Sequence, residues 1–251
     1  MINPLLSCFD NFENDYRWRR IKIRTKKSKS GDVILIKQNS IHIRLGMNET
    51  TNCVIVLAAG LSSRFGENKM LKYFRGRRMV EYAVLSCLMA DIGDVIVVGS
   101  AATKLDESIL SNVTLKINPR PENGISSSIR IGVESIPEYC DSVIISLGDQ
   151  PFIPPEHYSR LLKTAITNKA SIVYTKCSNR FGNPAYFSRK YFRFLSTMSG
   201  DTGARTLISD NLPDSKFVDI KDCRYLIDID EQQDLEKAER EFDALYPNGF
   251  I

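Results

Sequence analysis

Short apolar, β-branched runs alternate with helical patterns along most of this 251-residue chain. The pattern predicts strands over 53–58, 94–98, 113–118 and 142–147, and helices over 79–91, 102–110, 126–135, 155–168 and 231–243. Strands that alternate with helices form parallel sheets covered on both faces. We therefore predict an α/β fold, a doubly wound and mostly parallel sheet, within residues 51–245.

The second half of this region is less regular. Strand-like runs occur at 171–175, 184–187 and 216–219, and a short helix is expected to begin near 202–205. We interpret these residues as an insertion that caps one edge of the sheet and holds a second substrate.

Residues 1–50 form a basic N-terminal extension. Residues 1–46 contain ten Lys or Arg and four Asp or Glu, whereas the rest of the chain contains 24 and 26, so the excess positive charge lies in the first segment. A basic arm can bind nucleic acid. Because Met47 stands just before the first strand of the main domain, we favour a disordered extension or a misplaced start, with a hairpin within residues 33–45. No function is assigned to it.

Composition excludes several classes of protein. No apolar run approaches the ~20 residues that span a bilayer, so we expect no membrane partner, and the N-terminus lacks a secretory pattern. The six cysteines include no C-x-x-C pair, which leaves a zinc site unsupported. We expect several cysteines to be buried as small apolar groups, and we expect the protein to be cytoplasmic.

The stretch that follows the first predicted strand carries the strongest chemical signal. Small residues after Ala58 allow a ligand to approach the backbone, and Arg64 and Lys69 add positive charge to the same loop. Gly60 and Gly66 are too far apart for a Walker loop, and no G-x-G-x-x-G is present. The pattern indicates a nucleoside triphosphate site; an ordinary strand–loop–helix connection is the alternative.

Two acidic segments are candidates for a metal site. Asp149 follows the apolar run 142–147, where a buried carboxylate needs a cationic partner, and Mg²⁺ shared with phosphate oxygens would serve. Either Asp228 or Asp230 would complete the metal shell, while the other caps the helix from about 231. Helix capping is the alternative for each of these acids.

A third strand-end loop runs from Asn118 to Ser128. Its hydroxyls and amide are able to hydrogen-bond a base or ribose, or to cap a helix. His157 lies on a predicted helix and is assigned to packing or the surface, so no Ser/His/Asp or Cys/His set can be assembled. The catalytic effects left to this chain are positioning of the substrates and stabilisation of charge, and phosphoryl-type transfer relies on these two effects.

Six motifs together resemble the molybdenum cofactor cytidylyltransferase branch of the MobA-like nucleotidyltransferases, which have a Rossmann-like fold. The resemblance spans about 53–240, and its motifs are the loop 57–69, the stretch 118–128, Gly148-Asp149-Gln150-Pro151, Gly182-Asn183-Pro184, Gly200-Asp201-x-Gly203-Ala204-Arg205, and Asp228-Ile229-Asp230 with Asp234-Leu235. The chain departs from the family at 231–233, where Glu-Gln-Gln replaces the usual Thr-Pro-Glu, and in its N-terminal segment.

This resemblance implies transfer of CMP from CTP to the terminal phosphate of molybdopterin, with an apo-molybdoenzyme as a further partner that receives the product. Arg64, Lys69 and Asp149 would be catalytic, and Asp149 and Asp230 would bind Mg²⁺. The implied nucleotide contacts are Leu57, Ala58, Ala59, Gly60, Ser62, Arg64, Lys69, Asn118, Gly124, Ser126 and Ser128. The implied acceptor contacts are Gly182, Asn183, Pro184, Asp201, Gly203 and Arg205.

Ala59 bears on the choice of base. The cytidylyl branch has L-A-A-G where the guanylyl branch has L-A-G-G, and a methyl group narrows the base pocket, although one methyl supplies only about 1–3 kcal/mol of discrimination. The alternatives are a transferase that uses GTP, one that uses a sugar or polyol phosphate acceptor, and a non-catalytic carrier of the cofactor.

Overall fold

The computed structural model describes residues 51–60, 71–200, 203–212, 215–229 and 232–246, and the backbone of three N-terminal strands. The chain divides into two compact units, Met1–Leu45 and Gly46–Ile251. The first unit contains an antiparallel sheet of β1 (Arg24–Lys27), β2 (Val33–Lys37) and β3 (Ser40–Ile43). The β2–β3 pair confirms the hairpin predicted within residues 33–45.

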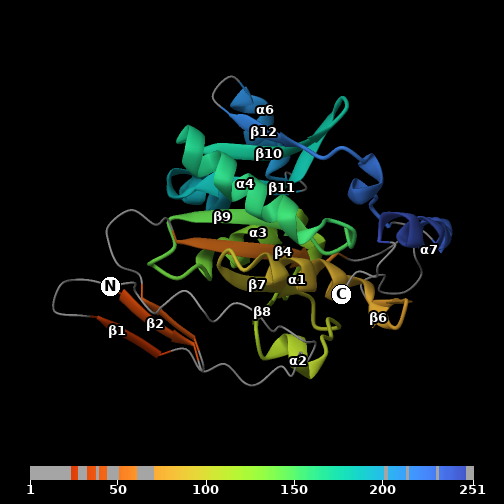
Figure 1. Ribbon diagram of the computed structural model, residues 1–251, viewed down its shortest axis with the longest axis horizontal. Helices are drawn as coiled ribbons and strands as arrows, with labels where there is room; N and C mark the ends of the chain where they lie inside the picture. The colour runs from red at the N-terminus through yellow and green to blue at the C-terminus, as the bar shows by residue number, and fades with distance from the viewer. Residues whose placement is uncertain are drawn as a thin grey trace, which may run out of the picture. The chain divides into compact units, whose positions relative to one another are not determined.

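The second unit is built on a seven-stranded sheet in the order β12-β10-β11-β9-β4-β7-β8 (Figure 1). Its strands are β4 (Asn52–Ala58), β7 (Asp94–Gly99), β8 (Thr114–Ile117), β9 (Ser142–Leu147), β10 (Ile172–Cys177), β11 (Arg180–Ser188) and β12 (Lys216–Asp219). All neighbours are parallel except β11, which runs antiparallel to both β9 and β10. This architecture confirms the predicted doubly wound, mostly parallel α/β fold.

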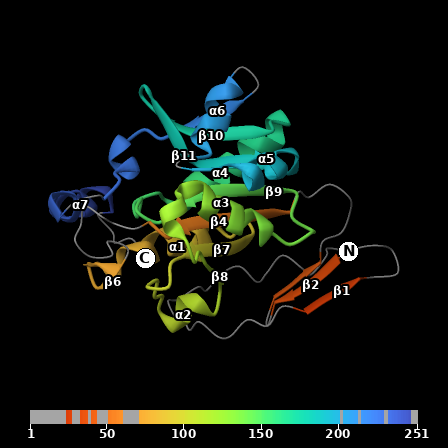
Figure 2. The same cartoon turned by 180° about the vertical axis from the view of Figure 1, so that it is seen from behind.

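Helices cover both faces of the sheet, as Figures 1 and 2 show from opposite sides. One face packs against α1 (Met79–Ala90), α2 (Glu107–Leu110) and α4 (Pro155–Asn168), and the other against α3 (Ile125–Glu134), α5 (Phe192–Thr197) and α6 (Arg205–Asp210). Strand β4 supplies both cores, because successive side chains point to opposite faces: Val54 and Val56 to one, Ile55 and Leu57 to the other. A strand buried on both faces reads as a continuous apolar run, which the sequence shows.

A third apolar cluster surrounds α7 (Gln232–Leu245). Phe242 of α7 packs within 6 Å of Phe74, Tyr82 and Phe152, measured between ring centroids. Phe74 belongs to the short hairpin of β5 (Tyr73–Phe74) and β6 (Arg77–Arg78). Short 3-10 helices among the described residues are η2 (Pro121–Asn123), η3 (Arg189–Tyr191) and η5 (Cys223–Leu226). Among the described helices, none has both the length and the apolar character needed to cross a membrane.

The predicted insertion in the second half of the domain lies at the edge of the sheet and adds strands to it. Strands β11, β10 and β12 continue hydrogen bonding beyond β9 instead of folding over it. The helix predicted over 102–110 was wrong in its first half: Thr103 forms a turn with Ser100, and Asp106 caps a helix that begins only at Glu107. Helix α5 and the β5–β6 hairpin were not predicted.

Four of the six cysteines form disulfides, Cys53 with Cys140 and Cys177 with Cys223, which the prediction of several buried small apolar cysteines did not include. Cys87 of α1 is free and buried as predicted, and burial raises the pKa of its thiol to about 12. The pairings join residues 87 and 46 positions apart, so spacing along the chain gave no signal for them.

His157 is a packing residue of α4 and is fully buried. The Thr175 hydroxyl donates to the Pro184 carbonyl at 2.6 Å, so its oxygen must accept from His157 Nε2 at 2.8 Å. His157 Nδ1 is therefore unprotonated, and it has no hydrogen-bond partner among the described residues. Burial lowers the pKa of this imidazole to about 4, because a proton added at Nδ1 would place an unsatisfied charge in the core.

This buried imidazole predicts acid destabilisation. Between the unfolded pKa of about 6.5 and the folded value of about 4, the unfolded chain binds the extra proton, so stability falls as the pH falls. From pH 7 to 5 the loss attributable to this group is about 2 kcal/mol. Urea unfolding of wild type and His157→Gln at both pH values measures it, since Gln can still donate to Thr175. Equal pH dependence in the two proteins would contradict the assignment.

Candidate active site

A cavity of about 380 Å³ lies at the carboxyl end of the central parallel strands. We call it the glycine-loop cavity, and its lining is Leu57, Ala59, Gly60, Pro121, Glu122, Gly124, Ile125, Ser128, Leu147 and Asp149. Three predicted motifs therefore meet here: the start of the glycine loop, the 118–128 loop and the acid after β9. In open α/β sheets, ligands bind at this end of the strands.

The register of two parallel strands places Asp149 in this cavity. Leu57 of β4 pairs with Leu147 of β9, and the Gly148 amide then donates to the Leu57 carbonyl at 2.8 Å. A Cβ at Gly148 would lie 3.1 Å from that carbonyl and from the Ala58 side chain, so glycine allows the close approach. Asp149 follows at once, half-buried, at the end of a strand that fixes its backbone.

Asn118 organises the loop that carries Ser128 in the cavity wall. It is buried, and its amide nitrogen donates to the hydroxyls of Ser127 at 2.7 Å and Ser128 at 2.9 Å. Its amide oxygen accepts from the Arg120 backbone at 3.0 Å. These bonds fix the position of Ser128 in the cavity wall, and a direct contact of Asn118 with nucleotide stays a prediction.

Helix α3 joins this loop to the region predicted to bind the acceptor. It begins after Gly124, whose φ of 85° favours glycine, and Ser126 in its first turn donates through its hydroxyl to the Gly200 carbonyl at 2.6 Å.

Ala58 is buried within the sheet and does not line the cavity.

The predicted acidic segment near the C-terminus lies beside Asp149. The Ile229 amide donates to the Asp149 carbonyl at 3.2 Å, and Gln150 Nε2 donates to Asp228 Oδ1 at 2.8 Å. Asp228 therefore anchors the Asp149–Gln150 loop, which favours the residue after Ile229 as the second metal ligand. That residue, Asp230, lies outside the described residues, and so do Ser62, Arg64, Lys69 and Asp201.

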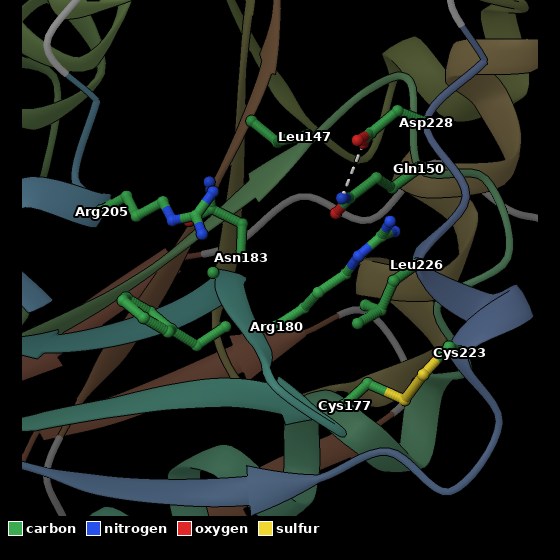
Figure 3. A pocket seen from close by; sticks show the side chains of 11 residues that line it. Leu147, Gln150, Cys177, Arg180, Asn183, Arg205, Cys223, Leu226 and Asp228 are labelled. Carbon is green, nitrogen blue, oxygen red and sulfur yellow. Dashed lines mark hydrogen bonds between the residues drawn. A yellow bond between two sulfur atoms is a disulfide. The ribbon is translucent and has the colours of Figure 1, made fainter. Parts of the chain in front are cut away.

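A second cavity, of about 390 Å³, shares Leu147 with the first. We call it the Arg180 cavity (Figure 3), and its lining is Leu147, Gln150, Cys177, Arg180, Phe181, Gly182, Asn183, Arg205, Cys223, Leu226 and Asp228. A third, of about 510 Å³, is lined by Ile125, Asn183, Gly203, Ala204, Arg205, Thr206 and Ser209. The 182–183 and 203–205 segments thus line neighbouring cavities, whereas Pro184 is buried and its carbonyl accepts from Thr175.

Sequence reasoning did not select Glu122, Gln150 or Arg180 as site residues. Gln150 lies within the Gly148–Pro151 motif, and Arg180 stands two residues before Gly182, so position near a motif was the available signal. Gln150 and Arg180 line their cavity because of how the β10–β11 hairpin and the turn after β9 fold, which the sequence does not indicate.

The sequence of this domain matches a known protein family. Residues 54–215 match the family model of the MobA-like NTP transferase domain. The chain belongs to the MobA-like family of nucleotidyltransferases. Transfer of a nucleotidyl group is therefore the general activity of its family, and the predicted family is confirmed.

Curated proteins similar to this chain have names that indicate different functions. The purine catabolism protein PucB of Bacillus subtilis is 27% identical over 197 residues, which cover 74% of this chain and 95% of PucB. The molybdenum cofactor cytidylyltransferase of Escherichia coli is 23% identical over 191 residues, covering 75% and 95%. These likenesses support the family without selecting a branch.

Solved structures share the fold. Rv0371c of Mycobacterium tuberculosis superimposes with a TM-score of 0.65 at 21% identity, covering 77% of this chain and 100% of that one. Its complex with manganese gives 0.63 at 20%, covering 76% and 99%. A CMP:2-keto-3-deoxy-manno-octonic acid synthetase complexed with CTP gives 0.59 at 13%, covering 76% and 98%.

The residues present fit a divalent cation such as Mg²⁺. Asp149 offers carboxylate oxygens, which Mg²⁺ prefers, at the rim of a cavity of nucleotide size. The backbone bond from Ile229 brings a second acidic segment to the same place. Mg²⁺ typically takes one or two carboxylates and completes its shell with phosphate oxygens and water, so no larger protein cage is needed.

Proposed function

We propose that this chain is a Mg²⁺-dependent cytidylyltransferase that transfers CMP from CTP to the terminal phosphate of molybdopterin. The observation that carries the proposal is the pair of adjoining cavities that meet at Leu147, one with the glycine loop and Asp149, the other with two arginines. A nucleotide and an anionic acceptor could thus bind on either side of the β9 end.

The chemistry is a single displacement at phosphorus. An oxygen of the acceptor phosphate forms a bond to the α-phosphorus of CTP, and the bond from that phosphorus to the bridging β-oxygen breaks, releasing pyrophosphate. Arg64 and Lys69 would bind the triphosphate, while Asp149 and Asp230 would hold Mg²⁺. When bound, the ion supplies positive charge against the phosphate oxygens. Positioning and charge stabilisation are sufficient for such a reaction.

The acceptor would bind in the Arg180 cavity and its neighbour. Gly182, Asn183, Gly203 and Arg205 line these cavities, and Arg205 would contact an anionic group of the acceptor. Asp201 is proposed to act in the same loop.

Ala59 is proposed to favour cytosine. Its side chain is almost fully buried in the wall of the glycine-loop cavity. We expect Ala59→Gly to admit GTP and to lower the CTP preference by about 10-fold, the effect of one methyl group. The ratio of kcat/KM for CTP and GTP measures this preference, and an unchanged ratio would remove Ala59 from base selection.

The test of the function is pyrophosphate release by the purified protein with Mg²⁺ and molybdopterin, supplied with CTP or GTP. Release from CTP alone supports the proposal, whereas release from GTP indicates a guanylyltransferase. A polyol or sugar phosphate that replaces molybdopterin successfully would identify a different acceptor. CTP binding without release with any acceptor would favour a carrier.

A further inference from the structure

Two guanidinium groups enter the Arg180 cavity from different elements. Arg180 begins β11 and Arg205 begins α6 (Figure 3). Within the described part of the chain, Arg205 stacks on the Phe181 ring at 4.9 Å, and neither guanidinium has an ion pair or hydrogen bond. Two cations beside one cavity, neither of them ion-paired within the described residues, indicate an anionic ligand.

The same cavity contains two acceptor oxygens that have no hydrogen-bond donor among the described residues. Gln150 is 6% exposed, and its Nε2 faces the Asp228 carboxylate, which can only accept. That contact fixes the orientation of the amide and leaves Gln150 Oε1 buried with no hydrogen-bond partner. Asn183 Oδ1 is in the same situation. Buried polar atoms in native structures are normally paired, so both oxygens point to N–H or O–H donors on a ligand.

A bulge directs Asn183 toward this cavity. Tyr174 of β10 pairs with Ala185, but the next residue, Thr175, pairs with Gly182, so Asn183 and Pro184 face no residue of β10. Bulges of this kind re-aim side chains next to functional sites.

The position of Arg180 is fixed from two sides. It pairs with Cys177 across a tight turn in which Ser178 has a φ of 52°. Cys177 is bonded through its sulfur to Cys223, at the start of η5, and the chain from η5 leads to Asp228. The disulfide therefore fastens the hairpin that carries Arg180 to the segment that holds Gln150.

We propose that Arg180 is a specificity-determining residue that binds an anionic group of the acceptor, while Gln150 and Asn183 accept hydrogen bonds from the same molecule. This inference rests on the proposed function and names the acceptor class: an anion that also carries N–H or O–H donors, as a phosphorylated pterin does. An acceptor with a phosphate but without donors would leave two buried oxygens unpaired and be selected against.

The test compares Arg180→Met and Arg180→Lys with a matched control, Arg193→Met. Arg193 belongs to α5 and lines neither the glycine-loop cavity nor the Arg180 cavity. We expect Arg180→Met to raise the KM for molybdopterin about 10-fold or more without changing the KM for CTP, and Arg180→Lys to restore part of the loss. Arg193→Met should match wild type. A melting temperature measured for each variant separates a folding defect from a binding defect.

The outcomes distinguish the two proposals. If wild type turns over and Arg180→Met keeps the wild-type KM for molybdopterin, the role of Arg180 is wrong and the proposed function stands. If wild type shows no turnover, the proposed function fails, and inorganic phosphate titrated by calorimetry into the CTP-saturated protein tests Arg180 alone. Weaker phosphate binding by Arg180→Met supports the inference; equal binding, or none by wild type, overturns it.

Discussion

Asp149→Ala is expected to lower kcat for pyrophosphate release by about 1,000-fold or more, because the carboxylate that would hold the metal is lost. The fold should remain, since the backbone at this position is fixed by the β4–β9 register and by the Ile229 bond to the Asp149 carbonyl, neither of which uses the side chain. Pyrophosphate release with CTP, Mg²⁺ and molybdopterin, together with a melting curve, measures both effects.

Two controls make this result specific. Asp149→Asn preserves the shape of the side chain but removes its charge, and a loss comparable to that of alanine would attribute the effect to the ionised carboxylate. Glu134→Gln removes an exposed carboxylate at the end of α3, outside the three cavities, and should have turnover near wild type. If Asp149→Ala retained turnover within about 10-fold of wild type, the metal assignment would be wrong.

The fold was predictable wherever burial on both faces produced an unbroken apolar run. Strand β9 was predicted over 142–147 and occupies those residues, and α4 begins and ends as expected at 155 and 168. The pattern failed where local chemistry overrides periodicity. At 102–110, the Asp106 cap delays the start of the helix to Glu107, and at 73–78 a two-residue turn forms a hairpin too short to be recognised from the pattern.

The site was predictable to the extent that topology brings strand ends together. Gly60 and Asp149 lie about 90 residues apart, but parallel pairing of β4 with β9 places both in one cavity. Arg180 could not be predicted in this way. Its position depends on an antiparallel strand, a bulge and a disulfide to Cys223, and none of these has a local sequence signal.

The same segment of the chain holds residues of both cavities, and this would help to align the two substrates of the proposed reaction. Asp149 lines one cavity and Gln150 the other, although they are adjacent in the chain. Both are tied to the 228–229 segment, through a backbone bond and a side-chain bond respectively. A change that loosens this segment should therefore affect the proposed metal site and the proposed acceptor site together.

Gly93→Ala is expected to destabilise the fold by about 4 kcal/mol or more, which lowers the melting temperature by about 10 °C for a chain of this size. Gly93 lies between α1 and β7 with a φ of 156°, and a Cβ there would stand 1.8 Å from the Asn52 carbonyl. Asn52 begins the central strand and accepts a hydrogen bond from the Ser142 hydroxyl of β9, so the clash cannot be relieved without moving the strands that position Asp149.

The matched control is Gly76→Ala in the β5–β6 turn. Gly76 also has a positive φ, 83°, but a Cβ there would meet no atom within 4 Å. That variant should therefore lose only the cost of a left-handed conformation, about 1–2 kcal/mol. Thermal and urea unfolding of both variants would separate backbone strain from steric overlap. Equal losses in the two proteins would show that the close approach of Gly93 to Asn52 contributes nothing, and that the register of the central strands does not depend on it.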